Sequence, residues 1–177
     1  MGDFRNKEFQ TILKARKFVR DAGIASAPVD LERLVGAVNA RIRVVHDLFE
    51  DESGQTTRIM GTHVIIVNGN HREERQRFTV LHELAHIVLE LPSHHHGPKL
   101  RTETLMRYAR RPPEEVLCDV FAAECLLPHH LFSQDVGDVE ISMAVVKALA
   151  EKYKSSLTAT GSRFAVSAQD PCAFVLS

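Results

Sequence analysis

The pattern that most constrains this chain is His82-Glu83-Leu84-Ala85-His86, two histidines four residues apart with a glutamate directly after the first. In a helix of about 3.6 residues per turn, positions four apart lie on one face, roughly 6 Å from each other. Two imidazoles so placed can bind one tetrahedral Zn²⁺, and Glu83 can reach a water on that ion without binding the ion itself. The pattern therefore predicts a metal site suited to hydrolysis, with two nitrogen ligands, an open position and an adjacent base.

The residues around this pattern predict a helix over about 72–90. Apolar side chains recur at spacings of three and four around both histidines, a polar run over 72–77 begins the segment, and Pro92 follows it. The alternative is that the histidines make ordinary contacts beside a core. A third ligand would favour the metal site.

A second helix is predicted downstream, within residues 112–128, because prolines stand at both ends of a helix-forming stretch. Glu115 on this helix can complete a His₂Glu site with water in the fourth position. Asp119, one turn later, can accept the outer N–H of a ligating histidine and fix its tautomer. Glu114 fits a solvated first turn better, because only Glu115 lies four residues before Asp119. The small pair Ala122-Ala123 would let the two helices approach closely.

Residues 77–86 and 115–128 together resemble the ImmA/IrrE family of metallopeptidases, and the resemblance extends over about 25–165. That family pairs an R-x-F-T/S-x-x-H-E-x-x-H helix with an E-x-x-x-N/D-x-F-A-A-E-L-L-x-P helix. The chain departs from it at Asp119, where Asn is common, at Cys125, where Leu is common, and at 154–155, but no ligand is lost. The resemblance implies a gluzincin-like, zincin-type core, an intracellular location and action on a helix-turn-helix repressor of phage immunity or stress response.

Composition agrees with one soluble, cytoplasmic domain spanning 1–177. The chain has 44% hydrophobic residues, enough for a sizeable core, and a formal net charge of -1, which argues against nucleic acid or an anionic membrane as partner. No apolar run approaches the roughly 20 residues of a membrane span, and the first residues lack the apolar core of a signal peptide. Three irregularly spaced cysteines fit a reducing compartment, and Cys118 and Cys125 fit core positions better than metal ligands.

The expected fold class is α+β, a zincin-like core with a small, mainly antiparallel sheet packed on the two metal-binding helices and further helices at both ends. β-branched runs and turn residues indicate strands, and amphipathic runs indicate helices. The expected elements are helices over 5–21 and 30–38, strands over 42–45 and 62–67, a turn at 52–55 and a third strand near 58–61. An extended substrate would join the strand that borders the site, and His63 on the 62–67 strand is a candidate lining residue.

The C-terminal part, about 139–165, is a possible helix-turn-helix-like subdomain, with helices over 141–153 and 157–164. Its Ser, Thr and Arg side chains could touch DNA. Because the chain has no basic surplus, packing of this pair onto the metal-binding helices is the favoured interpretation. A last edge strand is predicted at 174–176, and the stretch 91–111, with His94-His95-His96 and Tyr108, is predicted to be a long connection that covers the site or binds metal adventitiously.

The chain is therefore expected to be a zinc-dependent endopeptidase, with His82, His86 and Glu115 as ligands, Glu83 as base and Asp119 orienting a ligand. Mn²⁺ or Co²⁺ would also suit this ligand set. Two other classes stay open: a zinc-bearing regulator or antitoxin-like protein that binds a repressor without cutting it, and a DNA-binding regulator. An intact Glu83 argues against the first, because a purely structural site needs no base.

Overall fold

A computed structural model describes residues 2–92 and 112–175. The helices and strands, in chain order, are α1 (Gly2–Asp21), α2 (Leu31–Gly36), β1 (Ala40–Val45), β2 (Gly54–Ile59), β3 (Thr62–Asn68), α3 (Glu73–Leu89), α4 (Pro113–Leu126), α5 (His129–Val136), α6 (Met143–Tyr153) and α7 (Leu157–Ser167). The predicted α+β class is confirmed. His94–His96 and Tyr108 lie outside the described residues.

The three strands form one sheet in the order β1-β3-β2. β2 and β3 are an antiparallel hairpin in which Ile59 pairs with Thr62. Met60 (φ 48°) and Gly61 (φ 84°) form its two-residue turn, and positive φ at both positions matches the twist of the strands. β1 pairs with the other edge of β3 in parallel, so the sheet is mixed rather than mainly antiparallel.

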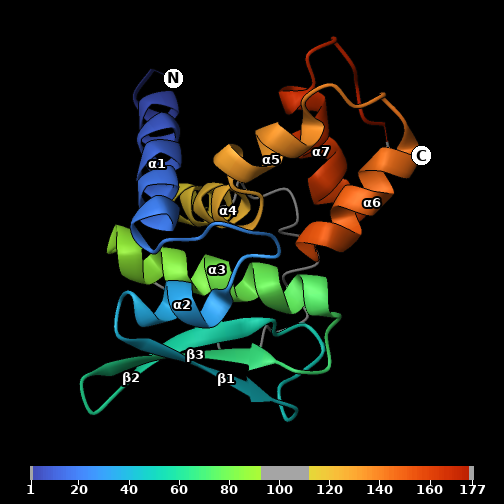
Figure 1. Ribbon diagram of the computed structural model, residues 1–177. Helices are drawn as coiled ribbons and strands as arrows, with labels where there is room; N and C mark the ends of the chain where they lie inside the picture. The colour runs from blue at the N-terminus through green and yellow to red at the C-terminus, as the bar shows by residue number, and fades with distance from the viewer. Residues whose placement is uncertain (1, 93–111, 176–177) are drawn as a thin grey trace.

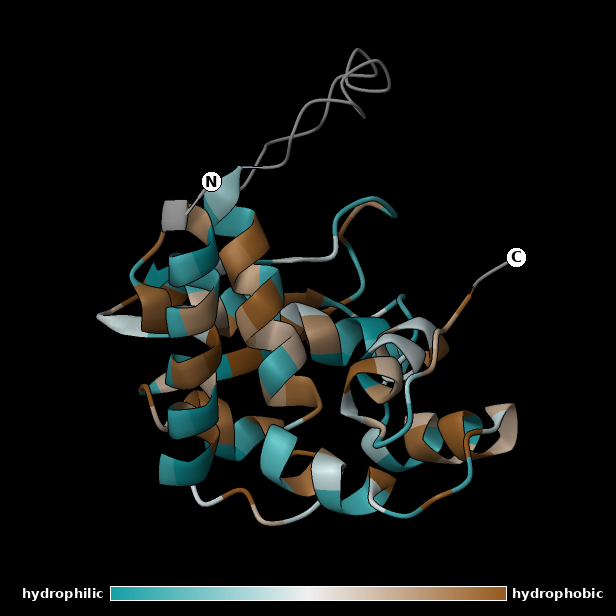
Figure 2. Cartoon of the chain, turned by 90° about the horizontal axis from the view of Figure 1, so that it is seen from above, coloured by the Kyte–Doolittle hydropathy of each residue, from teal (hydrophilic) through white to brown (hydrophobic). Residues whose placement is uncertain are grey.

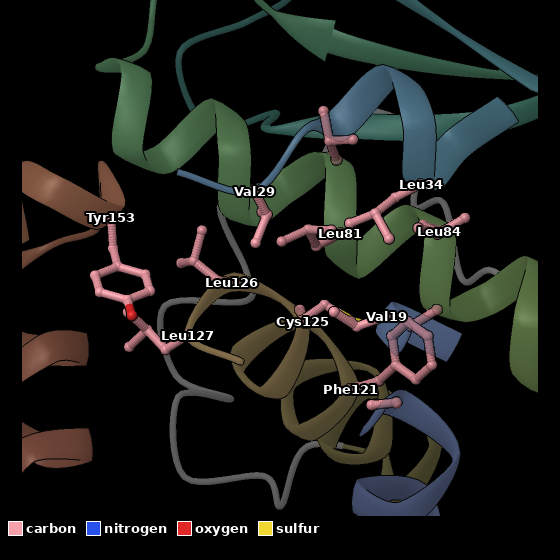
Figure 3. Close-up of a cluster of buried hydrophobic side chains, with 14 of the residues drawn as sticks. Val19, Val29, Leu34, Leu81, Leu84, Phe121, Cys125, Leu126, Leu127 and Tyr153 are labelled. Atoms are coloured by element: carbon pink, nitrogen blue, oxygen red, sulfur yellow. The ribbon is translucent and has the colours of Figure 1, made fainter. Parts of the chain in front are cut away.

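The sheet carries helices on one face, with α3 and α2 lying across it in Figure 1 and α1 and α4 stacked beyond α3. Seen from above, individual helices alternate between hydrophilic and hydrophobic residues, as expected for elements with one buried side (Figure 2). The core lies where α3 crosses α1, α2 and α4 (Figure 3). Among its fully buried side chains are Val19, Leu34, Leu81, Leu84 and Phe121.

The last three helices form a separate group to one side of α4 (Figure 1). Phe132 of α5 and Tyr153 of α6 pack ring against ring, with centroids 5.2 Å apart, and both are fully buried. The Tyr153 hydroxyl donates a hydrogen bond to Asp135 at 2.7 Å. Burial, together with this contact, raises the pKa of Tyr153 far above its usual value, so the phenol stays protonated and a donor.

A charged cluster joins this group to the rest of the chain. Oε1 of Glu124 on α4 accepts hydrogen bonds from Arg16 of α1 at 2.9 Å and from Arg163 of α7 at 2.8 Å. Arg163 also donates to the backbone carbonyl of Leu127 at 3.1 Å. The Glu124 side chain is only 2% exposed, so this carboxylate is stabilised by the two arginines rather than by water.

Several sequence-based boundaries are confirmed and others are corrected. Asp30 caps α2 by accepting a hydrogen bond from the Arg33 amide at 3.1 Å. The strand predicted near 58–61 lies earlier, because the Met60–Gly61 pair is a turn. The last edge strand is wrong within the described residues, since Phe174 is irregular and packs over Gly161 of α7, where a Cβ would lie 2.4 Å from the ring.

A candidate metal centre between two helices

The two histidines lie on α3, on the side that faces α4. His86 is buried, and His82 has a side-chain exposure of 14%. α3 continues to Leu89, and Glu90 caps its C-terminus. Glu90 adopts a left-handed conformation (φ 56°), and the cap amide donates to the carbonyls of His86 and Ile87. The helix is therefore intact across both histidines, and their side chains lie one turn apart on one face.

Glu115 approaches both histidines from the first turn of α4. Its Oε2 lies 3.1 Å from Nε2 of His82, its Oε1 lies 3.6 Å from Nε2 of His86, and the two Nε2 atoms are 3.3 Å apart. Bond lengths of about 2.0–2.1 Å around a tetrahedral zinc place neighbouring ligand atoms about 3.3 Å from each other. The donor set of two imidazole nitrogens and one carboxylate oxygen, all within 4.8 Å of one another, fits such an ion.

Asp119, one turn after Glu115, holds the outer nitrogen of His82. Its Oδ1 lies 2.9 Å from His82 Nδ1, and because a carboxylate only accepts, Nδ1 must carry the proton. Nε2 of a neutral His82 then points its lone pair at the oxygens of Glu115. Acceptor groups facing each other at this distance repel unless a cation or a proton lies between them. This arrangement is what a metal ligand with an orienting carboxylate requires.

The charges around the pair affect the two histidines differently. Burial opposes protonation of His82, but the hydrogen bond to Asp119 and the charges of Asp119, Glu83 and Glu115 outweigh burial, so the pKa of His82 is raised. For His86, burial dominates and the positive charge of His82 adds to it, so the pKa of His86 is lowered. The negative charge of Glu83 favours the protonated form of both rings, which places this carboxylate within electrostatic reach of the site.

The Glu83 side chain reaches the sheet. It is buried, with the residue 5% exposed, and its Oε2 accepts a hydrogen bond from Oγ1 of Thr56 on β2 at 2.9 Å. The sequence analysis did not single out Thr56. A lone threonine in a strand has no motif, so only the packing of β2 against α3 reveals the contact.

The cysteines of α4 lie outside the cluster. Burial, with the negative charges of Glu115 and Asp119, raises the pKa of Cys118 to about 12. The fully buried Cys125 has its pKa raised as well, chiefly by burial. Because a thiolate is the form that binds metal, both residues act as small core side chains, as their positions in the sequence suggested.

The comparison with known proteins agrees with these motifs. Residues 39–165 match the family described as the IrrE N-terminal-like domain. The chain belongs to this family. The radiation response metalloprotease IrrE of Deinococcus deserti is 29% identical over 129 residues, which cover 61% of this chain and 42% of that relative. A Mycobacterium tuberculosis transcriptional regulator has a similar fold, with a TM-score of 0.60 and 13% identity over 89% of this chain and 46% of that one. The chain thus spans less than half the length of both.

In this IrrE N-terminal-like domain a groove lies beside the start of α3 and the end of α4. It has a volume of about 810 Å³ and lies between α3, the end of α6 and the start of α7. Phe78, Leu126 and Leu157 supply apolar surface, and Arg72, Lys147 and Glu151 supply charge. Phe78 is the lining residue next to the cluster in the sequence, and its ring centroid lies 6.4 Å from that of His82.

The edge strand that contacts Glu83 is β2, whereas the 62–67 strand suggested by the sequence is central in the sheet. β3 is the central strand, and its His63 pairs with Ala40 on one side and Arg58 on the other. β2 pairs with β3 alone among the described strands and contacts α3 through Thr56. An extended chain joining the sheet on this side would therefore pair with β2.

Among residues 2–92 and 112–175, no single helix has both the length and the apolar character to cross a membrane. α4 and α5 would satisfy both criteria only as a pair, and a bend of 56° separates them.

Proposed function

We propose that the protein is a zinc-dependent endopeptidase in which His82, His86 and Glu115 hold the metal. The observation that carries this proposal is the convergence of two histidines of one helix and a glutamate of another within 4.8 Å, next to the buried carboxylate of Glu83. Mn²⁺ and Co²⁺ are compatible with the same donor set, and metal availability selects among them.

A divalent ion held by these three residues would supply Lewis-acid catalysis and would lower the pKa of water there towards about 7. Glu83 acts as the general base, takes the proton of the attacking water and delivers it to the nitrogen of the cleaved peptide bond. Asp119 holds His82 in the tautomer that leaves Nε2 unprotonated, and its hydrogen bond of 2.9 Å fixes the ring plane. Thr56 holds the Glu83 carboxylate, and Asp119 holds the His82 ring.

The substrate we propose is a helix-turn-helix repressor, cleaved in an extended segment. Support comes from the family, from β2, which contacts Glu83, and from the groove at the start of α3. β2 can pair with an extended chain through its backbone, and the groove has the volume of a typical ligand site. Backbone pairing would align the scissile bond, and the groove would select side chains.

The experiment that tests this proposal uses the zinc-loaded protein and a candidate repressor encoded beside its gene. Wild type is expected to cleave the repressor, and chelator is expected to stop cleavage. Glu83→Gln is expected to retain one metal per chain by elemental analysis and to lose cleavage, because the amide cannot accept the proton. Glu115→Ala is expected to lose both metal and activity. A Glu83→Gln protein that cleaves at the wild-type rate would disprove the assigned base.

A non-proteolytic regulator that binds a repressor is the alternative, and it predicts binding without cleavage in the same experiment. Direct DNA binding through α6 and α7 has less support. Thr160 is fully buried, Arg163 is paired with Glu124, and Ser156 caps α7 by accepting from the Ala159 amide. These three polar side chains are therefore used within the fold, whereas Thr158 and Ser162 of α7 are exposed.

A further inference from the structure

β2 runs alongside α3 and contacts it at two successive points. At the first point, Gly54 lies so close to the helix that a Cβ would be 2.6 Å from Cγ2 of Thr79 and 2.6 Å from the Ile66 carbonyl. At the second point, Thr56 meets Glu83. Two strand residues span about 6.6–6.8 Å, and four helical residues span about 6 Å. The close approach at Gly54 therefore brings Thr56 onto Glu83, one helical turn beyond Thr79.

The position of β2 is fixed at its start as well. The Asn68 amide donates to the Ser53 carbonyl at 2.9 Å, and the fully buried Asn68 side chain donates to the carbonyls of Phe49 and Glu52 at 3.0 and 2.9 Å. These bonds hold the connection that leads into β2. The position of β2 along α3 is thus set by these hydrogen bonds rather than by the contact between Thr56 and Glu83.

Thr56 is oriented for this contact by the sheet. It pairs with Ile65, which is fully buried, so the Thr56 side chain is on the face that packs against α3. Oγ1 lies 2.9 Å from Oε2 of Glu83 and 3.4 Å from the Glu83 carbonyl. A threonine side chain has one torsion to a branched Cβ and is stiff, whereas a glutamate carboxylate turns about three torsions. The hydroxyl can therefore fix the carboxylate.

We propose that Thr56 is a positioning residue, which holds the carboxylate of Glu83 in the orientation required of the general base. This inference depends on the proposed function, and it adds the sheet to a catalytic centre otherwise built from two helices. Proton transfer depends strongly on geometry, and a displacement of about 1 Å can cost on the order of 100-fold in rate. Loss of the Thr56 hydroxyl should therefore reduce turnover without changing substrate affinity.

The test compares Thr56→Val, which keeps the shape of the side chain, with Thr56→Ser, which keeps the hydroxyl. Thr57→Val is the matched control, since Thr57 pairs with Val64 on the opposite face of β2. With the repressor as substrate, Thr56→Val is expected to lower kcat about 10- to 100-fold, with KM within about twofold and full metal content. Thr56→Ser should recover most of the loss. A Thr56→Val protein with wild-type kcat would overturn the inference.

A second measurement does not depend on activity. Thermal unfolding of Thr56→Val, Glu83→Ala and the double variant forms a double-mutant cycle, and a contact between the two side chains predicts that the losses in Tm do not add. Additive losses would overturn the inference even if kcat fell. If the cycle shows coupling but wild type cleaves no repressor, the proposed function fails, and the catalytic role of Thr56 fails with it while the contact stands.

Discussion

The buried Glu124 allows a quantitative prediction about stability. Glu124 joins α4 to α1 through Arg16 and to α7 through Arg163, and its side chain is 2% exposed, against 31% and 19% for the two arginines. Removing one partner of a buried ion pair costs about 3–5 kcal/mol, because it leaves an uncompensated charge. In Glu124→Ala the charges left behind keep access to water, so we expect the lower end, about 3 kcal/mol.

The single-arginine variants should cost less, in an order set by exposure. Arg163→Ala removes a donor that also bonds the Leu127 carbonyl, and we expect a loss of about 2 kcal/mol, in the range for hydrogen bonds to charged groups. Arg16→Ala removes the more exposed partner, and we expect about 1 kcal/mol. In both variants Glu124 retains one arginine. The predicted order of destabilisation is therefore Glu124→Ala, then Arg163→Ala, then Arg16→Ala.

Thermal unfolding followed by circular dichroism measures these differences. For a chain of this size about 1 kcal/mol shifts Tm by roughly 2–4 °C, so Glu124→Ala should lower Tm by about 6–12 °C. Glu140→Ala is the matched control, because Glu140 is exposed in the connection before α6. The reasoning would be refuted if Glu124→Ala shifted Tm no more than the control does. It would also be refuted if the Glu124 and Arg163 losses were additive in the double variant.

Three further predictions concern the metal, the thiols and the groove. With free metal at first 100-fold above its Kd, bound metal stabilises the fold by about 2.7 kcal/mol, so chelation should lower Tm of wild type by about 5–11 °C. Chelation should leave Tm of Glu115→Ala unchanged. Equal shifts in both proteins would contradict the assigned ligands. A thiol reagent at neutral pH should label Cys172 quickly and leave Cys118 and Cys125 unlabelled until the chain unfolds, because burial holds the pKa of both thiols above the usual range; fast labelling in Cys172→Ser would disprove this. Ala150→Trp should fill the groove and raise KM for the repressor while kcat for a short peptide stays the same; an unchanged KM would mean that the substrate does not enter the groove.

Local spacing explains why the sequence predicted so much of the site. His82, His86, Glu115 and Asp119 form two i, i+4 pairs, and helical geometry alone places each pair on one face. The helix bounds followed from prolines and from apolar periodicity in the same way. Spacing alone does not show that the faces of α3 and α4 meet. In the structure they do, because the Glu115 oxygens lie 3.1 Å from Nε2 of His82 and 3.6 Å from Nε2 of His86.

The features that the sequence did not predict depend on tertiary contacts. Thr56 has a role only because Gly54 permits β2 to approach α3. Residues 129–136 form α5, a short helix that begins directly after Pro128 and that was not predicted. The apolar residues at 174–176 have strand-like composition, but Phe174 packs against α7 instead of pairing with a strand. Glu124 was noted within a motif, and its partners lie 108 and 39 residues away along the chain.

The placement of functional groups along α4 has a mechanical consequence. Glu115 and Asp119 occupy its first two turns, Phe121 packs in the core midway, and Glu124 anchors α1 and α7 near its end. A displacement of α7 would move Arg163 and, through the Arg163–Glu124 bond, the end of α4. Because α4 is a stiff helix, this movement would reach its first turn. A molecule that inserts between α7 and α4 would therefore disturb Glu115 from a distance. In the proposed peptidase, a compound that separates these two helices would act away from the histidines.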